Sequence, residues 1–579
     1  MRGASKQATI TSLFLVVMII GQLAIFALYG DKKTSYHVDE LYTYGLSNSY
    51  DAAFLYEGAP ADGLNTPQLN HWLGHSVFLE YLTVQQGEGF AYDRVYYNQT
   101  QDVHPPLYYI LIHTICSFFP NTFSKWFGLG LNFVLFALCQ VVLYKLSIEM
   151  LKTRGKSLLV CALWGFGVGA LNTVLFIRMY ALLTLFVLLS FLIHVKITQT
   201  NKIPIKYILG VIAITILGDL TQYYFYIYSF LLAVVVGIFF VKNGSGRNLF
   251  IYSASAAISF LISITIFPAI FVHFNGYRGD DAVNGMMHLE ISGPMLRSIY
   301  SMINQELFGL PSSIANLFAY IQSSIWFVLC IVIPITILVV FIFYISRKSK
   351  KIEEKSEEAK SLCKNVLCKI KSVSSVFKAR ERTVLLIMFG ITLLYIWIIS
   401  NIAPDMGLFM DRYVFCIFPF ICILAVACLS TIFSKLIKRT WLRNFTLILL
   451  IAIFVSSSHW NNKRQYLYSD NEPRIHLSSA IAGTNCIFVT EHDYLLHSMS
   501  NLFMSSDNVY STRPDDVDQI IKGVNSAPGN SALTLIISAN AYSDMILQQI
   551  EDGTDFSPLF LSIGLSGDEY YYIYELQEL

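Results

Sequence analysis

The residues of this chain that are best suited to chemistry stand where apolar segments begin or end. Asp39 and Glu40 follow the first apolar run. Asp102 and His104 lie in the stretch QDVHPPLYYILIH, residues 101–113. A carboxylate within hydrogen-bonding reach of a hydroxyl group acts as a general base and typically raises the rate by ~10²–10⁴-fold. The acids therefore predict a site for proton abstraction.

Cationic, amide and aromatic side chains stand at the ends of further apolar segments. In chain order they are Arg178, Tyr180, Gln222, Tyr223, Arg278, Arg412 and Tyr413. An arginine fork matches the oxygens of a phosphate group in a two-point hydrogen bond. Aromatic rings offer flat surfaces to sugars and settle at the depth of lipid headgroups. Together with the acids, these residue types predict a site for a phosphorylated, lipid-borne substrate.

The composition shows which elements must position these side chains. Of the 579 residues, 55% are hydrophobic and only 14% are charged, whereas a soluble domain carries about 25% charge. Apolar windows of roughly 20 residues, the length that crosses a hydrocarbon core, recur along the chain. The sequence therefore predicts a multi-pass protein of the cytoplasmic membrane. A net charge of +1 gives no indication of a nucleic-acid partner.

Hydropathy predicts about eleven transmembrane helices. They lie near 8–29, 125–147, 157–176, 180–198, 205–221, 223–241, 249–271, 320–346, 384–402, 413–435 and 444–459. Segment 107–119 is apolar but too short to span, so we expect an interfacial helix there. The first run lacks a small-residue cleavage site, which predicts a retained anchor.

Loop charges orient these spans. With the N-terminus inside, the inner loops are basic, as the positive-inside rule requires; they are 148–156, 199–204, 242–248, 347–383 and 436–443. The large first outer loop, 30–106, is acidic. A further span at 107–119 would invert every later loop. The topology therefore predicts that the C-terminus and all the candidate site residues lie outside.

The last part of the chain has a different pattern. Short β-like runs alternate with helical stretches, and these runs are 486–490, 533–538 and 570–576. Such alternation predicts a small external α/β domain at 460–579, more typical of a scaffold or acceptor-docking module than of a second enzyme. We expect residues 1–459 to form an all-α membrane domain, with a charged cytoplasmic linker at 347–383.

Several motifs resemble the GT-C superfamily of membrane glycosyltransferases. They are HVDELYTY after the first span, then DVHPPLYY, RMYALL, LTQYYF, FPAIFVHFNGYRG and DRYVFCIFPF. The likeness extends over roughly residues 8–435. It is strongest to bacterial glycosyltransferase family 39, near the protein O-mannosyltransferases and the aminoarabinose transferases of lipid A. The acid pair followed by His-Pro-Pro is fairly specific in combination.

This resemblance implies transfer of a sugar from a polyprenyl-phosphate carrier on the outer face, with inversion at the anomeric carbon. It implies that Asp39 is the base and Glu40 its catalytic partner. It also implies that Asp102 and His104 line the site. The aminoarabinose transferases carry a lysine where His104 stands. Gln222 replaces a histidine of the family tract, which removes a titratable group there.

We therefore expect a lipid-phosphate-sugar-dependent glycosyltransferase of the hexosyltransferase type. Asp39 would accept the proton of the acceptor hydroxyl, while Arg178 and Arg412 would stabilise the departing polyprenyl phosphate. The acceptor is a lipid, a glycan or a protein of the envelope. Because the sequence holds no set of ligands at metal spacing, we expect no obligatory cofactor. A divalent cation is nevertheless compatible with the acids.

Two other functions compete with sugar transfer. A transporter or lipid flippase for a glycolipid precursor needs ionisable groups near the midplane and access from both sides. The third alternative is a non-catalytic sensor or assembly factor that uses the external domain. The candidate residues also have structural explanations. Arginines reach up to headgroups and tyrosines form aromatic belts. A hydrogen bond at a helix end explains Asp219, and a hydrogen bond to the backbone explains an interfacial His273.

Overall fold

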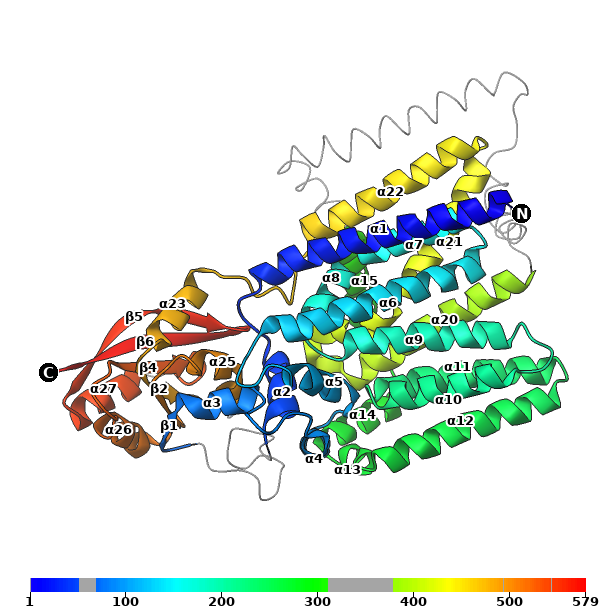
Figure 1. The fold of residues 1–579 in the computed structure, drawn as a ribbon. Helices are drawn as coiled ribbons and strands as arrows, with labels where there is room; N and C mark the ends of the chain where they lie inside the picture. The colour runs from blue at the N-terminus through cyan, green and yellow to red at the C-terminus, as the bar shows by residue number, and fades with distance from the viewer. Residues whose placement is uncertain (1, 51–68, 311–378, 493, 543) are drawn as a thin grey trace. The chain divides into compact units, whose positions relative to one another are not determined.

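The computed structural model describes residues 2–50, 69–310, 379–492, 494–542 and 544–579 (Figure 1). The span expected at 320–346 and most of the linker expected at 347–383 lie outside these residues. The chain forms two compact units. The first comprises Met1–Ile19, Gln140–Leu171 and Met286–Arg464, and the second comprises Ile20–Cys139, Asn172–Gly285 and Gln465–Leu579.

Long apolar helices confirm a multi-pass membrane protein. Eight helices of the described residues are long and apolar enough to cross a membrane. They are Thr9–Lys32 within α1 (Arg2–Lys32), α6 (Lys125–Leu151), α9 (Tyr180–Ile197), α11 (Tyr224–Lys242), α12 (Gly246–Ile266), Thr383–Ile402 within α20 (Ala379–Ile402), Asp411–Leu436, which includes α21 (Phe418–Leu436), and α22 (Thr440–Asn461). Each of them coincides with a segment that hydropathy predicted to span.

Two other predicted spans have a different form. The segment expected at 157–176 consists of α7 (Arg154–Gly165) and α8 (Val168–Leu175), which are bent by 57° at a short break. The segment expected at 205–221 is α10 (Ile205–Asp219), with 15 residues. Such a helix is roughly 22 Å long, which is less than the ~30 Å of a hydrocarbon core. The described residues thus leave the count of eleven unconfirmed.

The first unit is helical. Its helix α7 packs against α21 and α22, and α20 packs against α21. Shorter elements complete it, namely α15 (Gly293–Ile303), the π-helix η1 (Asn304–Phe308) and the 3₁₀-helix η3 (Pro404–Ile417). The predicted residues Arg412 and Tyr413 lie on η3.

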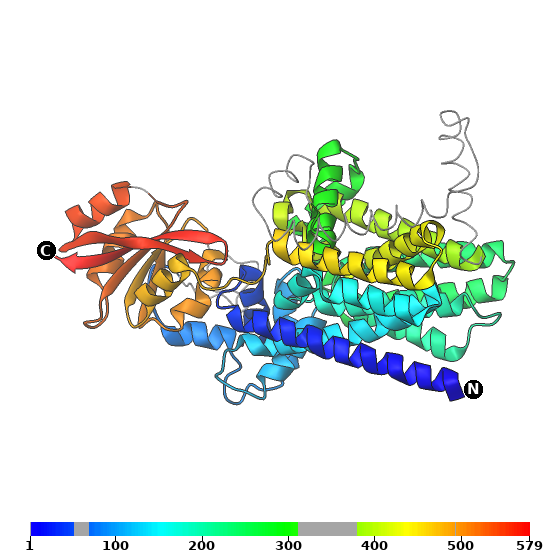
Figure 2. The same ribbon diagram turned by 90° about the horizontal axis from the view of Figure 1, so that it is seen from above.

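The second unit contains the helices that follow the first span. These are α2 (Val38–Asn48), α3 (His75–Leu82), α4 (Tyr92–Gln101) and α5 (Leu107–Cys116), and α2 packs against the other three. Helix α5 is the short apolar helix expected near 107–119. Its N-cap is Pro106, which lacks an N–H donor and therefore fits a helix start. Helices α9 to α12 pack side by side in the same unit (Figures 1 and 2), and α13 (Ile270–Phe274) and α14 (Tyr277–Met287) follow α12.

The C-terminal part of the second unit contains a six-stranded sheet in the order β1-β3-β2-β4-β6-β5. The central strands β2 (Asn485–Val489), β3 (Asn508–Thr512) and β4 (Leu533–Ser538) run parallel. The hairpin β5 (Phe556–Ser566) and β6 (Glu569–Glu578) extends one edge, and β1 (Trp72–Gly74) pairs antiparallel with β3 at the other. The loop after the first span thus supplies a strand to this sheet.

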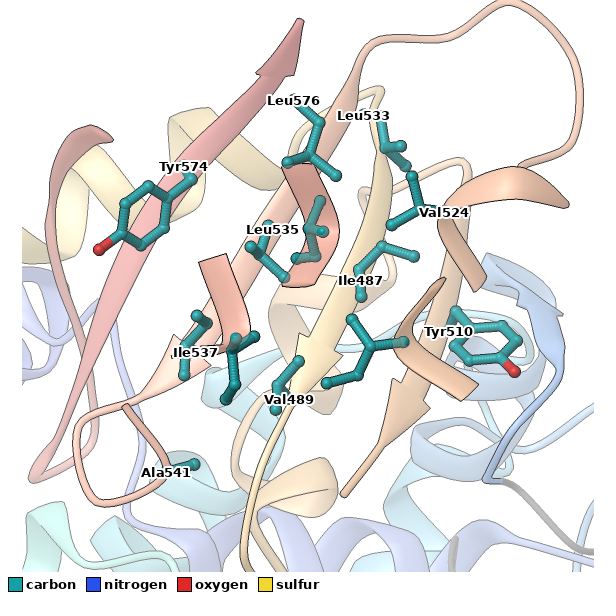
Figure 3. Close-up of a cluster of buried hydrophobic side chains, with 13 residues drawn as sticks. Ile487, Val489, Tyr510, Val524, Leu533, Leu535, Ile537, Ala541, Tyr574 and Leu576 are labelled. Carbon is teal, nitrogen blue, oxygen red and sulfur yellow. The ribbon is translucent and has the colours of Figure 1, made fainter. Parts of the chain in front are cut away.

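Apolar side chains cover both faces of the central strands, as expected for parallel strands. On one face, Ile487, Val489, Leu535 and Ile537 pack against the helices α26 (Val517–Asn525) and α27 (Asp544–Gly553) (Figure 3). On the other face, Phe488 contacts Phe503 of α25 (Ser500–Phe503). The remaining helices of this region are α23 (Glu472–Ile481) and α24 (Tyr494–Ser498). The predicted α/β pattern is confirmed.

Candidate active site

The predicted acid pair lies in the first turn of α2. His37 is the N-cap residue, and its Nδ1 atom accepts a hydrogen bond of 3.1 Å from the backbone N–H of Asp39. The Oε2 atom of Glu40 accepts one of 2.8 Å from the backbone N–H of His37. This reciprocal arrangement is a capping box, which explains why a helix begins here. The Asp39 side chain is 21% exposed, and its Oδ2 atom lies 3.7 Å from Nδ1 of His37.

Glu40 is placed very differently from Asp39, because its side chain has no exposed area. Its Oε2 atom lies 2.9 Å from Nζ of Lys33, and Oε1 accepts a hydrogen bond of 2.9 Å from the backbone N–H of Ile177. Burial raises the pKa of the Glu40 carboxyl, while Lys33 and the Ile177 N–H counteract this rise. The described contacts of the carboxylate are all with donors, so they favour its ionised form.

Arg178 lies in the non-helical break between α8 and α9. The side-chain amide of Asn132 donates to the carbonyl oxygens of Val174 and Phe176, at 3.0 and 2.9 Å. The hydroxyl of Tyr108 in turn donates to Oδ1 of Asn132 at 2.9 Å. Buried backbone carbonyls outside regular helices need such partners for their polar groups. Asn132 therefore fixes the segment that presents Arg178.

The Arg178 guanidinium joins three elements of the second unit. Arg178 is only 3% exposed. Its Nη1 atom donates to Oγ1 of Thr43 on α2 at 3.2 Å and to the hydroxyl of Tyr109 on α5 at 2.8 Å, and Nη2 lies 3.4 Å from Nε2 of His104. Burial lowers the pKa of Arg178, but the nearby Tyr109 and Asp39 raise it more strongly. The Thr43 hydroxyl in turn donates to the backbone carbonyl of Asp39 at 2.9 Å, so this hydroxyl links Arg178 to the residue that carries the predicted base.

Asp102 and His104 form a second polar pair beside Arg178. Nδ1 of His104 lies 2.8 Å from Oδ2 of Asp102, and their side chains are 19% and 14% exposed. Burial by itself raises the pKa of the Asp102 carboxyl, but His104 and Arg178 outweigh burial and bring the pKa below its ordinary value. Asp102 is therefore ionised at neutral pH and adds negative charge beside the guanidinium.

Tyr223 belongs to a neighbouring polar chain. Its hydroxyl lies 2.7 Å from Nδ1 of His273, and Nε2 of His273 lies 3.3 Å from the carbonyl oxygen of Thr100. A carbonyl only accepts, so Nε2 carries the proton and Nδ1 accepts from the tyrosine. Burial lowers the pKa of His273, and Asp102 partly counteracts this. Gln222 instead uses Oε1 to accept from the backbone N–H of Tyr223 at 2.7 Å.

The other predicted residues have separate settings. Tyr180 is buried and its ring stacks on that of Phe176, with centroids 5.7 Å apart. Arg278 lies in the first turn of α14, and its side chain is outside the described part. In the first unit, Nη2 of Arg412 donates to the hydroxyl of Tyr413 at 3.1 Å.

Sequence reasoning left several supporting residues out of the site. They are Lys33, His37, Thr43, Tyr109 and Asn132. One of them carries a usable signal, since Thr43 stands four residues after Asp39 and thus shares its helix face. Asp219 accepts a hydrogen bond of 2.9 Å from Ser263 of α12. Within the described ranges, no group of three or more His, Cys, Asp or Glu side chains is arranged to hold a metal ion.

Comparison with known proteins finds similarity at the level of structure. No protein-family model and no curated protein matches the sequence. Two solved structures of ArnT from Cupriavidus metallidurans align with 97% of this chain and 98% of their own. The apo form is 10% identical with a TM-score of 0.48, and the form bound to undecaprenyl phosphate is 9% identical with a TM-score of 0.47.

Proposed function

We propose that this protein transfers a sugar from a polyprenyl-phosphate-linked donor to an acceptor of the cell envelope. The reaction takes place at the outer face of the membrane and inverts the anomeric carbon. The observation that carries this proposal is a hydrogen-bonded link: the buried guanidinium of Arg178 donates to Oγ1 of Thr43, and the Thr43 hydroxyl donates to the backbone carbonyl of Asp39, whose carboxylate is partly exposed. This link supports the proposal of a base for the acceptor and a cation for the leaving phosphate on neighbouring segments.

Asp39 acts as the general base. It accepts the proton of the acceptor hydroxyl while the acceptor oxygen forms a bond to C1 of the sugar. The bond between C1 and the phosphate oxygen breaks, and its electron pair leaves with the polyprenyl phosphate. Since the acceptor attacks opposite the leaving group in a single displacement, the configuration at C1 inverts.

Arg178 stabilises the phosphate as its negative charge grows. The described hydrogen bonds of the guanidinium go to a hydroxyl, a phenol and an imidazole, and none goes to a carboxylate. A buried cation gains from a direct anionic partner, and the departing phosphate supplies one. A charge held in a water-excluded site also acts more strongly than the same charge in water.

The other predicted residues complete the proposed site. Asp102 and His104 orient Arg178, while Tyr180, Gln222 and Tyr223 face the sugar or its carrier. From the sequence alone, Arg278, Arg412 and Tyr413 are proposed as contacts of a lipid phosphate. Because the arginines supply the positive charge, the reaction needs no obligatory metal ion.

The proposed topology follows from loop charge. The basic loops place the N-terminus inside, with residues 1–459 as the transferase domain and 460–579 as an external domain. The donor is a polyprenyl-phosphate hexose, and the acceptor is a lipid, a glycan or a protein of the envelope.

Mass spectrometry of envelope glycolipids and glycoproteins tests the proposal. Cells that lack the protein are compared with cells that carry the wild-type chain or Asp39→Asn. The wild-type chain is expected to restore one sugar increment on the acceptor, and the variant is expected to reach the membrane without restoring it. Restoration of the full increment by Asp39→Asn would contradict the proposal.

A further inference from the structure

Lys33 and Glu40 form a buried ion pair next to the proposed base. Their Nζ and Oε2 atoms lie 2.9 Å apart, and neither side chain has exposed area. Taking two charges out of water is costly, and their attraction offsets this only when the geometry is good and further hydrogen bonds are made. A pair of this kind contributes little net stability, so its presence beside Asp39 calls for another explanation.

Glu40 connects the two parts of the chain that carry the proposed base and the proposed phosphate ligand. Its Oε1 atom accepts from the backbone N–H of Ile177, which directly precedes Arg178. Its own backbone directly follows Asp39, and its Oε2 atom closes the capping box at the start of α2. The Glu40 carboxylate thus binds the backbone at the start of α2, next to Asp39, and the backbone at Ile177, next to Arg178.

Lys33 is surrounded by the segment that follows α22. Its Nζ atom donates to the carbonyl oxygen of Tyr466 at 2.7 Å and lies 4.9 Å from the ring centroid of Tyr468. The Tyr466 ring stacks on Phe176, with centroids 4.1 Å apart. Tyr466 and Tyr468, which lead into the C-terminal sheet, therefore cover the Lys33 side of the ion pair. Tyr466 also packs against the break between α8 and α9 that carries Arg178.

These contacts exclude Glu40 from direct chemistry. A catalytic acid or base must reach the proton it transfers, and a fully buried carboxylate held by the N–H groups of His37 and Ile177 and by Lys33 does not. We infer that Lys33 and Glu40 are positioning residues, in which Glu40 fixes Asp39 relative to Arg178 and Lys33 holds the Glu40 carboxyl group in place through its hydrogen bond. The inference rests on the proposed function and replaces the catalytic role expected for Glu40.

The variants Lys33→Met, Glu40→Gln and the double variant Lys33→Met/Glu40→Gln separate positioning from mere stability. Loss of Lys33 alone leaves a buried charge without its partner, so we expect a large fall in Tm. The double variant removes that charge, so we expect Tm to recover. The amide of glutamine, however, turns one of the two acceptor oxygens into a donor that faces N–H groups. Positioning is therefore not restored.

The assay is transfer from a synthetic polyprenyl-phosphate hexose by the purified full-length chain. Misplacement of reacting groups by about 1 Å costs roughly 10²-fold, so kcat of the double variant is expected to stay about 10²-fold low while KM for the donor changes little. Ile546→Ala, on α27 in the buried core of the C-terminal sheet, is the matched control, with a lowered Tm and an unchanged kcat. Recovery of both Tm and kcat in the double variant would overturn the positioning role.

Hydrogen–deuterium exchange gives a readout that does not depend on activity. Because Glu40 accepts from the N–H of Ile177, peptides that cover residues 176–179 are expected to exchange faster in Glu40→Gln and in the double variant, but not in Ile546→Ala. Unchanged exchange would overturn the inference. Full transfer by Asp39→Asn in the same assay would instead overturn the proposed function, and the exchange result would still decide the role of the pair.

Discussion

The Nδ1 atom of His104 lies 2.8 Å from Oδ2 of Asp102, and the other ring nitrogen faces the guanidinium of Arg178 at 3.4 Å. An arginine only donates hydrogen bonds, so Nε2 of His104 accepts and Nδ1 carries the proton that is donated to Asp102. The carboxylate thereby fixes the tautomer of the histidine. The histidine in turn fixes one arm of the guanidinium.

Substitution of His104 should loosen Arg178. His104→Ala removes one contact of the guanidinium and the hydrogen bond of Asp102. A hydrogen bond to a charged group contributes about 1.5–3 kcal/mol, so we expect kcat/KM to fall roughly 10–100-fold, because one factor of ten in rate corresponds to about 1.4 kcal/mol. Transfer kinetics with a polyprenyl-phosphate hexose measure this. Unchanged kinetics would show that Tyr109 and Thr43 alone hold the arginine.

Two glycines of α6 make a matched pair for testing the position of the Arg178 segment. A Cβ atom on Gly128 would clash with Cγ2 of Ile177, whereas a Cβ atom on Gly130 meets nothing within 4 Å. Gly128→Ala must therefore displace Ile177, which is bonded to Glu40 and adjoins Arg178. We expect a lower Tm and a kcat that falls by about 10-fold or more, since small displacements of reacting groups are costly.

Gly130→Ala is the control for that substitution. Alanine in an open helical position stabilises by about 0.5–1 kcal/mol relative to glycine. We expect an equal or slightly higher Tm and unchanged transfer. Thermal unfolding and transfer kinetics should thus show a loss of Tm and of kcat in Gly128→Ala only. Equal behaviour of the two would argue against a tight contact at Ile177.

The C-terminal α/β region should become less stable in acid. His497 is fully buried, and its ring centroid lies 4.5 Å from that of Tyr42 and 5.2 Å from that of Tyr81. Burial lowers the pKa of His497 to about 3. The unfolded chain has the ordinary value of about 6.5. A lowered folded pKa means that the contribution to stability is complete above about pH 6.5 and is lost progressively as the pH falls towards the folded pKa.

Urea unfolding between pH 7.5 and pH 4.5 measures this dependence. Below pH 6.5, His497 is expected to remove about 1.4 kcal/mol per pH unit from the free energy of unfolding. His497→Leu cannot take up a proton, so its stability should depend less steeply on pH. An equally steep loss of stability in this variant would assign the acid sensitivity to other groups.

Hydropathy and helical periodicity predicted much of the membrane part. Eight apolar runs form long helices because each run is by itself long and apolar enough to span a membrane as a helix. The break between α7 and α8 was not predicted, since its geometry is set by partners elsewhere in the chain. The strand at 72–74 was likewise missed, because three residues give no periodicity and only pairing with β3 defines them.

The acids show most clearly what the sequence leaves open. Asp39 and Glu40 are neighbours of the same chemical type, yet a helix turns about 100° per residue, so one side chain is partly exposed and the other is buried. The partner of Glu40, Lys33, resembles an ordinary charge at the end of a span. Its contact with Tyr466 joins positions far apart in the chain, which no local pattern indicates.

Transfer by Asp39→Asn tests the central claim most directly. The purified full-length chain is given a synthetic polyprenyl-phosphate hexose and an envelope extract as acceptor, and the released polyprenyl phosphate is measured. Asp31→Asn, at an exposed acid only eight positions earlier, is the matched control. Loss of a general base costs about 10²–10⁴-fold, so Asp39→Asn should lose at least that lower factor while Asp31→Asn keeps the wild-type rate. Equal rates for both variants would contradict the account.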